Sequence, residues 1–388
     1  MVQTPGVSHD SITVANSAAE KGIFAGTGDP INAGIRAYFD MINSTGGIDG
    51  RRLIFTHTDD RYDPELAESI LSDYIDEQKI FAYVGHFGGP IVSRTLDTIH
   101  KSGMPVVYFG TGIGRLYNEK AVDFATGSNC YPIQPIYITE GRAMASIAIH
   151  DFHSTKIGIL YTDTRIGHDL LSGINITLRE HPVSTSSAVI PAPETLDRDM
   201  FLKAIKKAVQ EIKIYDPDFI IIAADQESFP DIADSLAASN THKTVLTSYV
   251  NTVVTTAMRL IPVVKDNFDV YSFGWLDYRS PAHSKALEEA SEWLGDYAMN
   301  GYAHCGWIGA HFLCEGLKRL TGKKITWKSF NKAMESAPVE NPFGGIVDYS
   351  GGQRLGTEEL SLYKLDPSTS LGWREVIPLR NVVTFHDK

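Results

Sequence analysis

Asn32-Ala-Gly-Ile-Arg-Ala-Tyr-Phe-Asp-Met-Ile-Asn43 is the stretch of sequence that decides the fold. Its apolar residues, from Ile35 to Ile42, recur at the spacing of one helical face, which predicts an amphipathic helix. A β-branched run at residues 12–15 and a glycine-rich loop at residues 22–28 precede this helix. Strand, loop and helix in this order are typical of a βαβ unit, so the sequence predicts a parallel sheet covered by helices.

The same alternation of short apolar runs and amphipathic segments recurs along the chain. The predicted strands cover residues 12–15, 53–57, 81–86, 105–109, 156–161, 187–190, 218–223, 244–247 and 269–273. A loop rich in Gly, Asn and Pro at residues 127–135 separates two series of strands, and we expect the chain to cross between lobes there. The predicted fold class is therefore α/β, with two doubly wound lobes.

Length and composition exclude several classes of protein. A chain of 388 residues is longer than one hydrophobic core usually spans, which agrees with two lobes. The sequence has no apolar run of about 18 residues, so no transmembrane helix is predicted. With 47 acidic against 35 basic residues, the net charge of -12 disfavours binding to nucleic acid.

The cysteines and the first residues leave the cellular compartment open. Cys130, Cys305 and Cys314 are too few and too scattered for a disulfide framework or a Cys-rich zinc site. Cys305 and Cys314 lie in an apolar helical stretch, where we expect them to be buried. Residues 1–10 lack the basic and apolar regions of a leader, so the protein is either cytoplasmic or has had a signal peptide removed.

Motifs of common enzymes and cofactor sites are missing from the sequence. Gly110-Thr-Gly-Ile-Gly114 is a GxGxG rather than a GxGxxG pattern, so its glycines are expected to let backbone amides approach a small ligand. His150 and His153 have no third ligand nearby, and the acidic loop at residues 59–65 is expected to be solvated or to cap a helix. We therefore predict no catalytic residue, no cofactor and no metal.

Residues that directly follow the strands are the candidates for ligand contact, because ligands of open α/β sheets bind at the carboxyl ends of the strands. Asp225 and Gln226 follow the most apolar strand, where Asp225 either contacts a ligand or caps a helix. Arg165 either binds a carboxylate or forms a surface ion pair. In the first series, backbone amides of Gly88, Gly89 and Gly110 and the Thr111 hydroxyl are expected to hold an anionic or carbonyl group, with Phe109 beside them.

Aromatic candidates follow the expected crossings and one strand. Tyr131, Tyr249 and Trp275 either face the ligand or pack the hinge. Walls of this kind suit a flat or aliphatic body that carries a hydrogen-bond donor.

Several passages resemble the branched-chain amino acid binding proteins of ABC importers, which have the type I periplasmic-binding-protein fold. The passages are Gly22-Ile-Phe-Ala-Gly-Thr-Gly-Asp29, residues 33–52 with their Asn-x-x-Gly-Gly-Ile-x-Gly turn, Thr58-Asp-Asp60 with Asp63-Pro64, Tyr83-Val-Gly-His86, and Lys156–Asp163 with Ile166-Gly167. The pattern runs over nearly the whole chain, and the match over the first 110 residues is the most specific.

The resemblance implies two lobes that are joined by three crossovers and enclose a ligand cleft that closes by a hinge motion. Lobe 1 would comprise residues 1–130 and 276–342, and lobe 2 residues 131–275 and 343–388. The resemblance also implies a monomeric periplasmic or extracellular receptor, without its signal peptide and either free or lipid-anchored, that delivers a small molecule to an ABC permease.

The sequence departs from the family pattern at the ligand-binding stations. The family's carboxylate-binding hydroxyl falls on Gly88-Gly89-Pro90, which has no hydroxyl, although Thr111 could supply one from the next loop. Ile166 stands at the family's aromatic station, and Tyr249-Val250 stand at the acidic station for an amino group. The predicted function is a non-catalytic receptor for an amino acid or a related ligand, such as an amide, a urea or an aromatic acid. The alternatives are a ligand-sensing domain of a signalling system and an enzyme of the same architecture.

Overall fold

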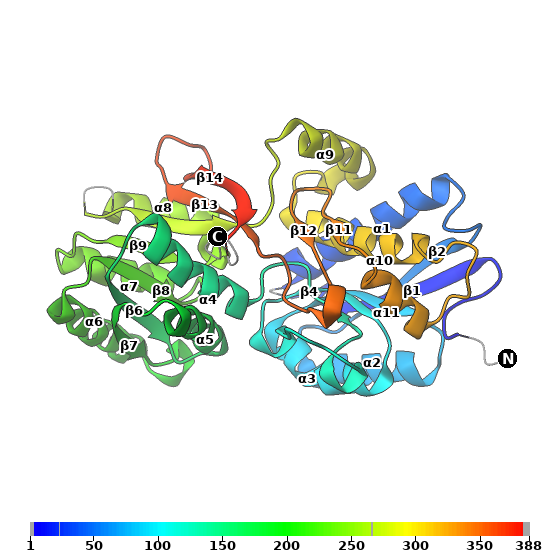
Figure 1. Ribbon diagram of the computed structural model, residues 1–388, viewed down its shortest axis with the longest axis horizontal. Helices are drawn as coiled ribbons and strands as arrows, with labels where there is room; N and C mark the ends of the chain where they lie inside the picture. Colours follow the sequence, from blue (N-terminus) through cyan, green and yellow to red (C-terminus); the bar gives the residue numbers. More distant parts are fainter. Residues whose placement is uncertain (1–3, 23, 265–266, 383–388) are drawn as a thin grey trace. The chain divides into compact units, whose positions relative to one another are not determined.

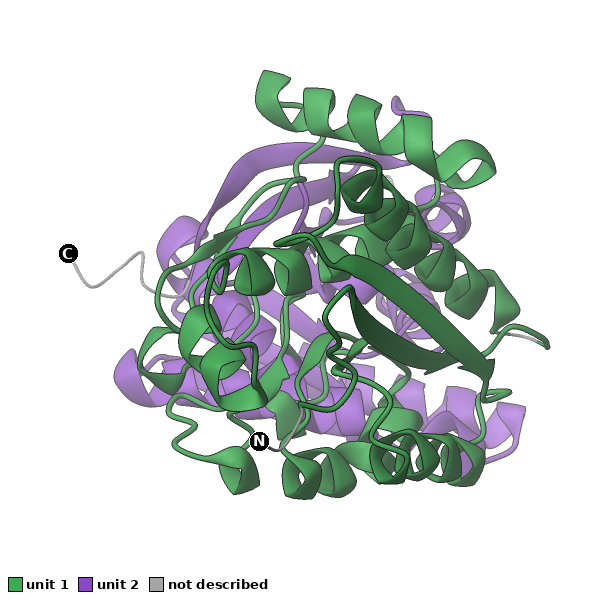
Figure 2. Cartoon of the chain, turned by 90° about the vertical axis from the view of Figure 1, so that its right-hand side faces the viewer, with its two compact units in different colours: residues 1–136, 277–357 green, residues 137–276, 358–388 purple. Residues whose placement is uncertain are grey.

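The computed structural model describes residues 4–22, 24–264 and 267–382 (Figure 1). The chain forms two compact units, which are coloured separately in Figure 2. Unit 1 consists of Met1–Ile136 and Asp277–Thr357, and unit 2 of Tyr137–Leu276 and Glu358–Lys388. The chain therefore passes between the units three times. Residue 23 of the predicted glycine-rich loop and the terminal residues 1–3 and 383–388 of the predicted lobes lie outside the described residues.

The boundaries of the units differ from those expected for the lobes. Residues 131–136 and 343–357, expected in lobe 2, belong to unit 1, and Leu276, expected in lobe 1, belongs to unit 2. The physical reason is that the two displaced segments of unit 1 pack on each other. The Thr357 N–H donates to the Ile133 carbonyl at 2.8 Å, and the Tyr349 hydroxyl donates to the Pro132 carbonyl at 2.9 Å.

Unit 1 contains a five-stranded sheet in the order β2-β1-β3-β4-β5, and its strands pair in parallel. The strands are β1 (Ser11–Ala18), β2 (Arg52–Asp59), β3 (Ala82–Phe87), β4 (Val106–Gly110) and β5 (Cys130–Tyr131). A short antiparallel pair, β11 (Val339–Glu340) with β12 (Ile346–Val347), also belongs to this unit. Because the parallel strands all point the same way, their carboxyl ends meet at one edge of the sheet. We call this end the carboxyl edge of unit 1.

The helices of unit 1 come from both ends of the sequence. They are α1 (Ala25–Ser44), α2 (Pro64–Asp76), α3 (Gly89–Ser102), α9 (Pro281–Leu294), α10 (Gly301–Lys318) and α11 (Trp327–Met334), with short 3₁₀ turns η1 (Gly114–Leu116), η2 (Phe124–Thr126), η6 (Gly295–Tyr297) and η7 (Ser350–Gly352). The helix that the opening stretch predicts is α1, which begins before Asn32. Figure 1 shows α10 beside α1, and Gly34 and Gly306 allow this close approach because a Cβ on either would lie 2.0 Å from a carbonyl oxygen of the other helix.

Unit 2 contains a seven-stranded sheet in the order β14-β13-β10-β9-β8-β6-β7. The strands are β6 (Lys156–Thr162), β7 (Ser184–Ile190), β8 (Phe219–Ala223), β9 (Thr244–Thr247), β10 (Val270–Gly274), β13 (Glu359–Leu365) and β14 (Trp373–Asn381). The helices are α4 (Tyr137–Ser146), the π-helical η3 (Ile147–Asp151), α5 (Arg165–Glu180), α6 (Arg198–Tyr215), α7 (Phe229–Ala238) and α8 (Val254–Val264), with 3₁₀ turns η4 (Pro193–Thr195) and η5 (Tyr249–Asn251). β13 and β14 extend the parallel sheet as an antiparallel hairpin.

The core of each unit lies between its sheet and its helices. All residues of β8 are buried, which explains its uninterrupted apolar sequence, since a central parallel strand is covered on both faces. Cys305 and Cys314 are buried as predicted, and Cys130 is buried as well. The predicted fold class, two α/β units with doubly wound parallel sheets, is confirmed.

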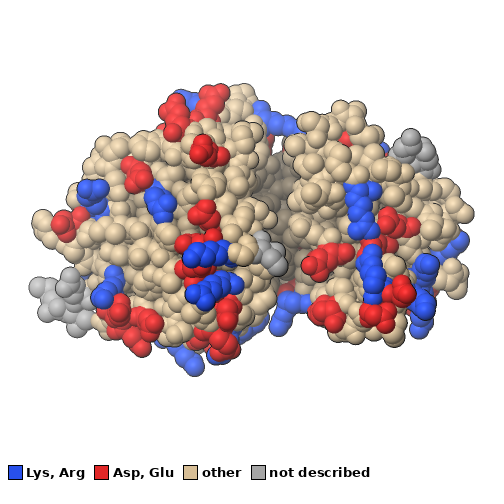
Figure 3. Space-filling view, turned by 180° about the vertical axis from the view of Figure 1, so that it is seen from behind, with Lys and Arg blue, Asp and Glu red and all other residues tan. Residues whose placement is uncertain are grey.

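Two further features concern the apolar character of the helices and the distribution of charge on the surface. Within the described ranges, no helix is both long and apolar enough to cross a membrane. On the face shown in Figure 3, Lys and Arg side chains lie among Asp and Glu side chains.

Candidate functional site

Two loops that the sequence singled out lie next to each other at the carboxyl edge of unit 1. Phe87, the last residue of β3, pairs with Gly110, the last residue of β4. Gly88 and Thr111 come directly after these residues, and the Gly88 N–H points to the Gly110 carbonyl at 3.5 Å. The structure thus brings the two predicted loops together.

The second half of this site is the start of helix α3. Gly88 is its N-cap and has no side chain to bond the first turn of the helix. In the described part of the chain, the N–H groups of Gly89 and Ile91 have no hydrogen-bond partner, and Pro90 between them has no N–H. Free N–H groups at a helix N-terminus carry a partial positive charge, which favours an anionic group.

Thr111 adds a hydroxyl to these donors. Its side chain is only 6% exposed, and its Oγ1 lies 3.6 Å from the position that a Cβ on Gly89 would occupy. Among the described residues, this hydroxyl has no hydrogen-bond partner. We call Gly88–Ile91 together with Thr111 the α3 site. It presents two N–H groups and one hydroxyl, which match the acceptors of a carboxylate.

An aromatic cluster, which we define as Phe24, Tyr62 and Phe87, adjoins the α3 site. The rings of Phe24 and Tyr62 stack with centroids 3.8 Å apart, and Phe87 lies 5.6 Å from Tyr62 and 6.3 Å from Phe24. An atom of the Tyr62 ring lies 2.5 Å from where a Cβ on Gly88 would be, so only glycine fits beneath this ring. The sequence interpretation missed all three residues, although Phe87 ends strand β3 and Phe24 and Tyr62 follow strands β1 and β2.

Asp60 holds Tyr62 in place. Its Oδ1 accepts the Tyr62 N–H at 2.9 Å, which supports the left-handed backbone of Tyr62 with φ of 60°. Asp60 is 1% exposed, and burial raises the pKa of its carboxyl group. The expectation of a solvated acidic loop is therefore wrong for Asp60, whereas Asp63 caps helix α2 as the alternative predicted.

Two predicted ligand residues lie in the core of unit 1 instead. Phe109 is fully buried beside His86. Tyr131 is also fully buried, and its hydroxyl donates to Asn331 at 2.6 Å while the Arg354 guanidinium lies 4.8 Å from its ring centroid. Burial with satisfied partners assigns both side chains to packing. Tyr131 belongs to unit 1 and not to the second lobe, because β5 completes the sheet of unit 1.

The corresponding edge of unit 2 carries Asp225 and Gln226 after β8. Asp225 Oδ1 accepts the N–H groups of Glu227 at 3.2 Å and Ser228 at 3.0 Å, so its carboxylate caps the turn before α7. Gln226 donates from Nε2 to the Val250 carbonyl, which ties the loops after β8 and β9 together. The capping alternative for Asp225 is thus present in the structure.

Glu140, which the sequence interpretation missed, fixes the loop that carries Tyr249. The side chain is fully buried, and its two carboxyl oxygens accept the Ser248 hydroxyl at 2.8 Å and the Tyr249 N–H at 2.6 Å. Burial raises the pKa of Glu140 to about 8. The Tyr249 ring stacks on Tyr137 with centroids 6.2 Å apart. In the sequence, the available signal for Glu140 was an acidic residue among the apolar residues of the segment that forms α4.

The remaining candidates of unit 2 lie at the same carboxyl ends. Arg165 is the exposed first residue of α5, after the N-cap Thr164, and in the described residues it forms no ion pair. The expected surface ion pair is therefore absent there. Trp275 follows β10 and packs, half-buried, against the apolar cluster of unit 2.

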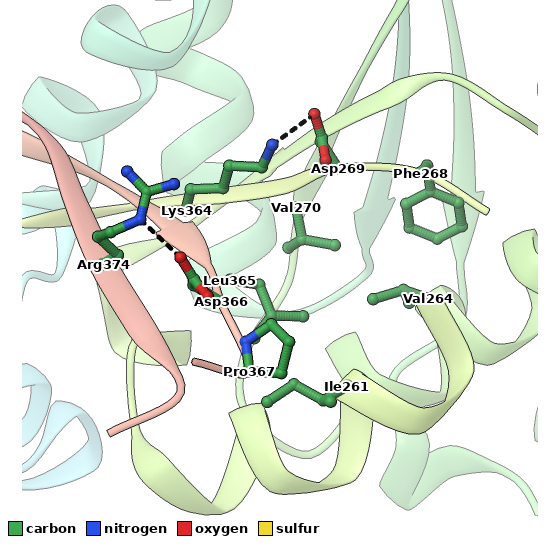
Figure 4. Close-up of a pocket in the computed structure, with 10 residues that line it drawn as sticks. All are labelled: Ile261, Val264, Phe268, Asp269, Val270, Lys364, Leu365, Asp366, Pro367 and Arg374. Carbon is green, nitrogen blue, oxygen red and sulfur yellow. Dashed lines mark hydrogen bonds and ion pairs between the residues drawn. The ribbon is translucent and has the colours of Figure 1, made fainter. Parts of the chain in front are cut away.

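Two cavities lie at the opposite, amino ends of the strands. Figure 4 shows one of about 260 Å³ in unit 2, where apolar side chains such as Val264 and Val270 line the cavity. Ion pairs Lys364–Asp269 at 2.8 Å and Arg374–Asp366 at 2.6 Å border it. The other, of about 350 Å³ in unit 1, adjoins the start of β1. Both cavities are remote from the carboxyl edges of the sheets, and the charged groups that border the cavity of unit 2 are already paired with each other. Neither cavity is therefore our candidate for the ligand site.

Metal ligation finds no support in the geometry. Within the ranges that the structure describes, no group of three or more His, Cys, Asp or Glu residues is placed to hold an ion. His150 packs against the ring of His181, with centroids 5.0 Å apart.

The architecture and the site together are typical of one class of protein. The chain forms two α/β units built on parallel strands, it passes three times between these units, and donor groups lie at the carboxyl ends of the strands. The chain belongs to the periplasmic binding protein family, whose model matches residues 11–369, and its fold is that of type I members. This family consists of extracytoplasmic solute-binding receptors. No curated protein matches the sequence significantly.

Solved structures share the fold at low sequence identity. A fatty acid ABC transporter substrate-binding protein from Thermomonospora curvata superposes with a TM-score of 0.75 at 19% identity, covering 99% of this chain and 96% of that one. A putative branched-chain amino acid ABC transporter protein from Rhodospirillum rubrum has a TM-score of 0.71 at 17% identity, with 94% and 100% covered. A possible leucine/isoleucine/valine-binding protein from Rhodopirellula baltica reaches 0.68 at 16%, with 97% and 98% covered.

Proposed function

We propose that this protein is the monomeric, extracytoplasmic substrate-binding receptor of an ABC importer and that it holds a carboxylate of its ligand at the α3 site. The observation that carries the proposal is the uncapped start of α3 beside Thr111, a buried residue whose hydroxyl has no hydrogen-bond partner among the described residues. Neighbouring structures named as ABC transporter proteins support the transport role.

The donors of the α3 site explain why a carboxylate is favoured. A hydrogen bond to a charged group contributes about 1.5 to 3 kcal/mol, roughly twice the contribution of a bond between neutral groups. Two N–H groups and a hydroxyl that are already fixed by the fold bind without being ordered first. A neutral amide in the same place gains less, because it brings no negative charge to the positive end of the helix dipole.

Mass spectrometry of small molecules that co-purify with the protein, followed by calorimetry, tests the proposal. The identified ligand is titrated as the acid and as its primary amide into wild-type protein, Thr111→Val and, as a control, Thr45→Val at the exposed end of α1. We expect the acid to bind better, Thr111→Val to weaken it roughly tenfold and Thr45→Val to have no effect.

Two outcomes would contradict the proposal. Equal affinity for acid and amide, together with no effect of Thr111→Val, would remove the α3 site from ligand binding. Conversion of the bound molecule during incubation would show an enzyme rather than a receptor.

A further inference from the structure

The aromatic cluster places ring faces directly beside the donors of the α3 site. Phe87 precedes the N-cap Gly88 in the chain, and the Tyr62 ring covers Gly88. Phe24 stacks on Tyr62 and remains 38% exposed. A large apolar ring that is accessible next to the N–H and hydroxyl donors of the α3 site can contact the body of a ligand whose anionic end is bound there.

The acids at this edge each bond groups of the chain itself through one carboxyl oxygen, and the second oxygen of Asp60 is buried. Asp59 Oδ1 accepts the N–H groups of Glu20 and Arg61, each at 3.0 Å. Asp60 bonds the Tyr62 N–H, and Asp63 caps α2. The Glu20 side chain accepts from His57 and, at 3.4 Å, from Asn32.

A zwitterionic amino acid needs an acceptor for its ammonium group, and removing an unpaired ammonium from water is costly. In unit 2, the carboxylate of Asp225, a candidate for ligand contact, caps the turn before α7 through its Oδ1. The groups at the carboxyl edge of unit 1 are instead N–H donors, a hydroxyl and aromatic faces. Together they match an anion with a flat apolar body.

We propose that the ligand is an aromatic carboxylate without an α-ammonium group, with its ring against Phe24 and its carboxylate at the α3 site. This inference rests on the proposed function and specifies its substrate class. Offset stacking between aromatic rings contributes beyond the burial of area, so an aryl ligand should be preferred over a saturated ring of the same size.

The experiment compares four probes by calorimetry: 3-phenylpropanoate, 3-cyclohexylpropanoate, 3-phenylpropanamide and L-phenylalanine. The variants are Phe24→Leu, which keeps an apolar side chain but removes the ring, Thr111→Val, and the control Tyr302→Leu. Tyr302 is 47% exposed on α10 of the same unit. Circular dichroism and melting curves verify that each variant folds.

We expect 3-phenylpropanoate to bind about three- to tenfold more tightly than its cyclohexyl analogue, and at least about tenfold more tightly than L-phenylalanine. Phe24→Leu should abolish the preference for the aryl ring, whereas Tyr302→Leu should leave it unchanged. Equal binding of the aryl and cyclohexyl acids, tighter binding of L-phenylalanine, or no binding of 3-phenylpropanoate would overturn the inference.

The two proposals fail in different ways. If the acid still binds better than the amide and Thr111→Val still weakens it, but the ring preference is missing, only the aromatic class is wrong. If the amide binds as well as the acid and Thr111→Val has no effect, the α3 site itself is wrong, even where Phe24→Leu lowers affinity.

Discussion

Single buried acids hold the loops at both carboxyl edges. In unit 1, Asp60 bonds the backbone of Tyr62, and in unit 2, Glu140 bonds Ser248 and the backbone of Tyr249. Glu140 lies far in sequence from both of its partners, Asp60 lies two residues from Tyr62, and both acids are removed from water. A buried carboxyl group is costly unless it is hydrogen-bonded, so moving either loop away from its acid would leave that acid without a partner. The two acids therefore fix the positions of the loops.

Glu140 gives the stability of the protein a dependence on pH. Its pKa is raised from 4.5 to about 8, so the folded state holds this proton more tightly than the unfolded state. The contribution of Glu140 to the free energy of unfolding, at most about 5 kcal/mol, is fully present below pH 4.5 and is lost as the pH rises to about 8. Denaturant unfolding of wild-type protein and Glu140→Gln between pH 5 and 9 measures it. The carboxamide resembles the protonated carboxyl group, so the variant should lack this decline; the same slope in both proteins would contradict the assignment.

At the scale of elements, the start of α3 depends on a glycine. Gly88 has φ of 99°, a region that favours glycine, and its missing Cβ leaves room for the Tyr62 ring. The helix thus begins without a capping side chain, which leaves its N–H groups available. The same absence of a side chain that weakens the helix end creates the α3 site.

Gly88→Ala should therefore affect both stability and binding. Gly46 is a matched control, because its φ is 101° and no atom lies within 4 Å of its added Cβ. We expect Gly46→Ala to cost about 1 kcal/mol of unfolding free energy from backbone strain alone, and Gly88→Ala to cost about 1 to 3 kcal/mol more, because the ring must move. Urea unfolding and calorimetry with 3-phenylpropanoate provide the measurements. A Gly88→Ala variant with the stability and affinity of Gly46→Ala would exclude the ring contact.

At the scale of the whole molecule, the chain passes three times between units that each have their own sheet and core. Few covalent connections between two cores are typical of proteins that close on a ligand by hinge motion. A ligand can shift such an equilibrium only by its different affinity for the open and closed states.

We expect small-angle scattering to show a smaller radius of gyration when 3-phenylpropanoate, or the co-purified ligand, saturates the protein. Thr111→Val at the same ligand concentration should show a smaller change, since fewer molecules are occupied. An unchanged radius of gyration at verified saturation of wild-type protein would count against hinge closure.

Much of the fold follows from local patterns in the sequence. The spacing of apolar residues predicted helix α1 and the alternation of strands and helices, because a side chain's face depends only on the period of its own element. The sequence also indicated Gly88, Gly89 and Thr111 as candidates for ligand contact, because the loops that follow parallel strands lie at one edge of the sheet.

Only the tertiary structure decided which of these residues are buried, paired or accessible. Tyr131 follows an expected crossing but lies in a core, Asp60 is in an acidic loop but is removed from water, and Phe24 is apolar but exposed. These outcomes depend on contacts between segments far apart in the sequence, such as Tyr131 with Asn331. The sequence by itself determined the elements and the edge at which a ligand should bind; packing between distant segments determined the groups that this edge presents, because burial is a property of neighbours in space.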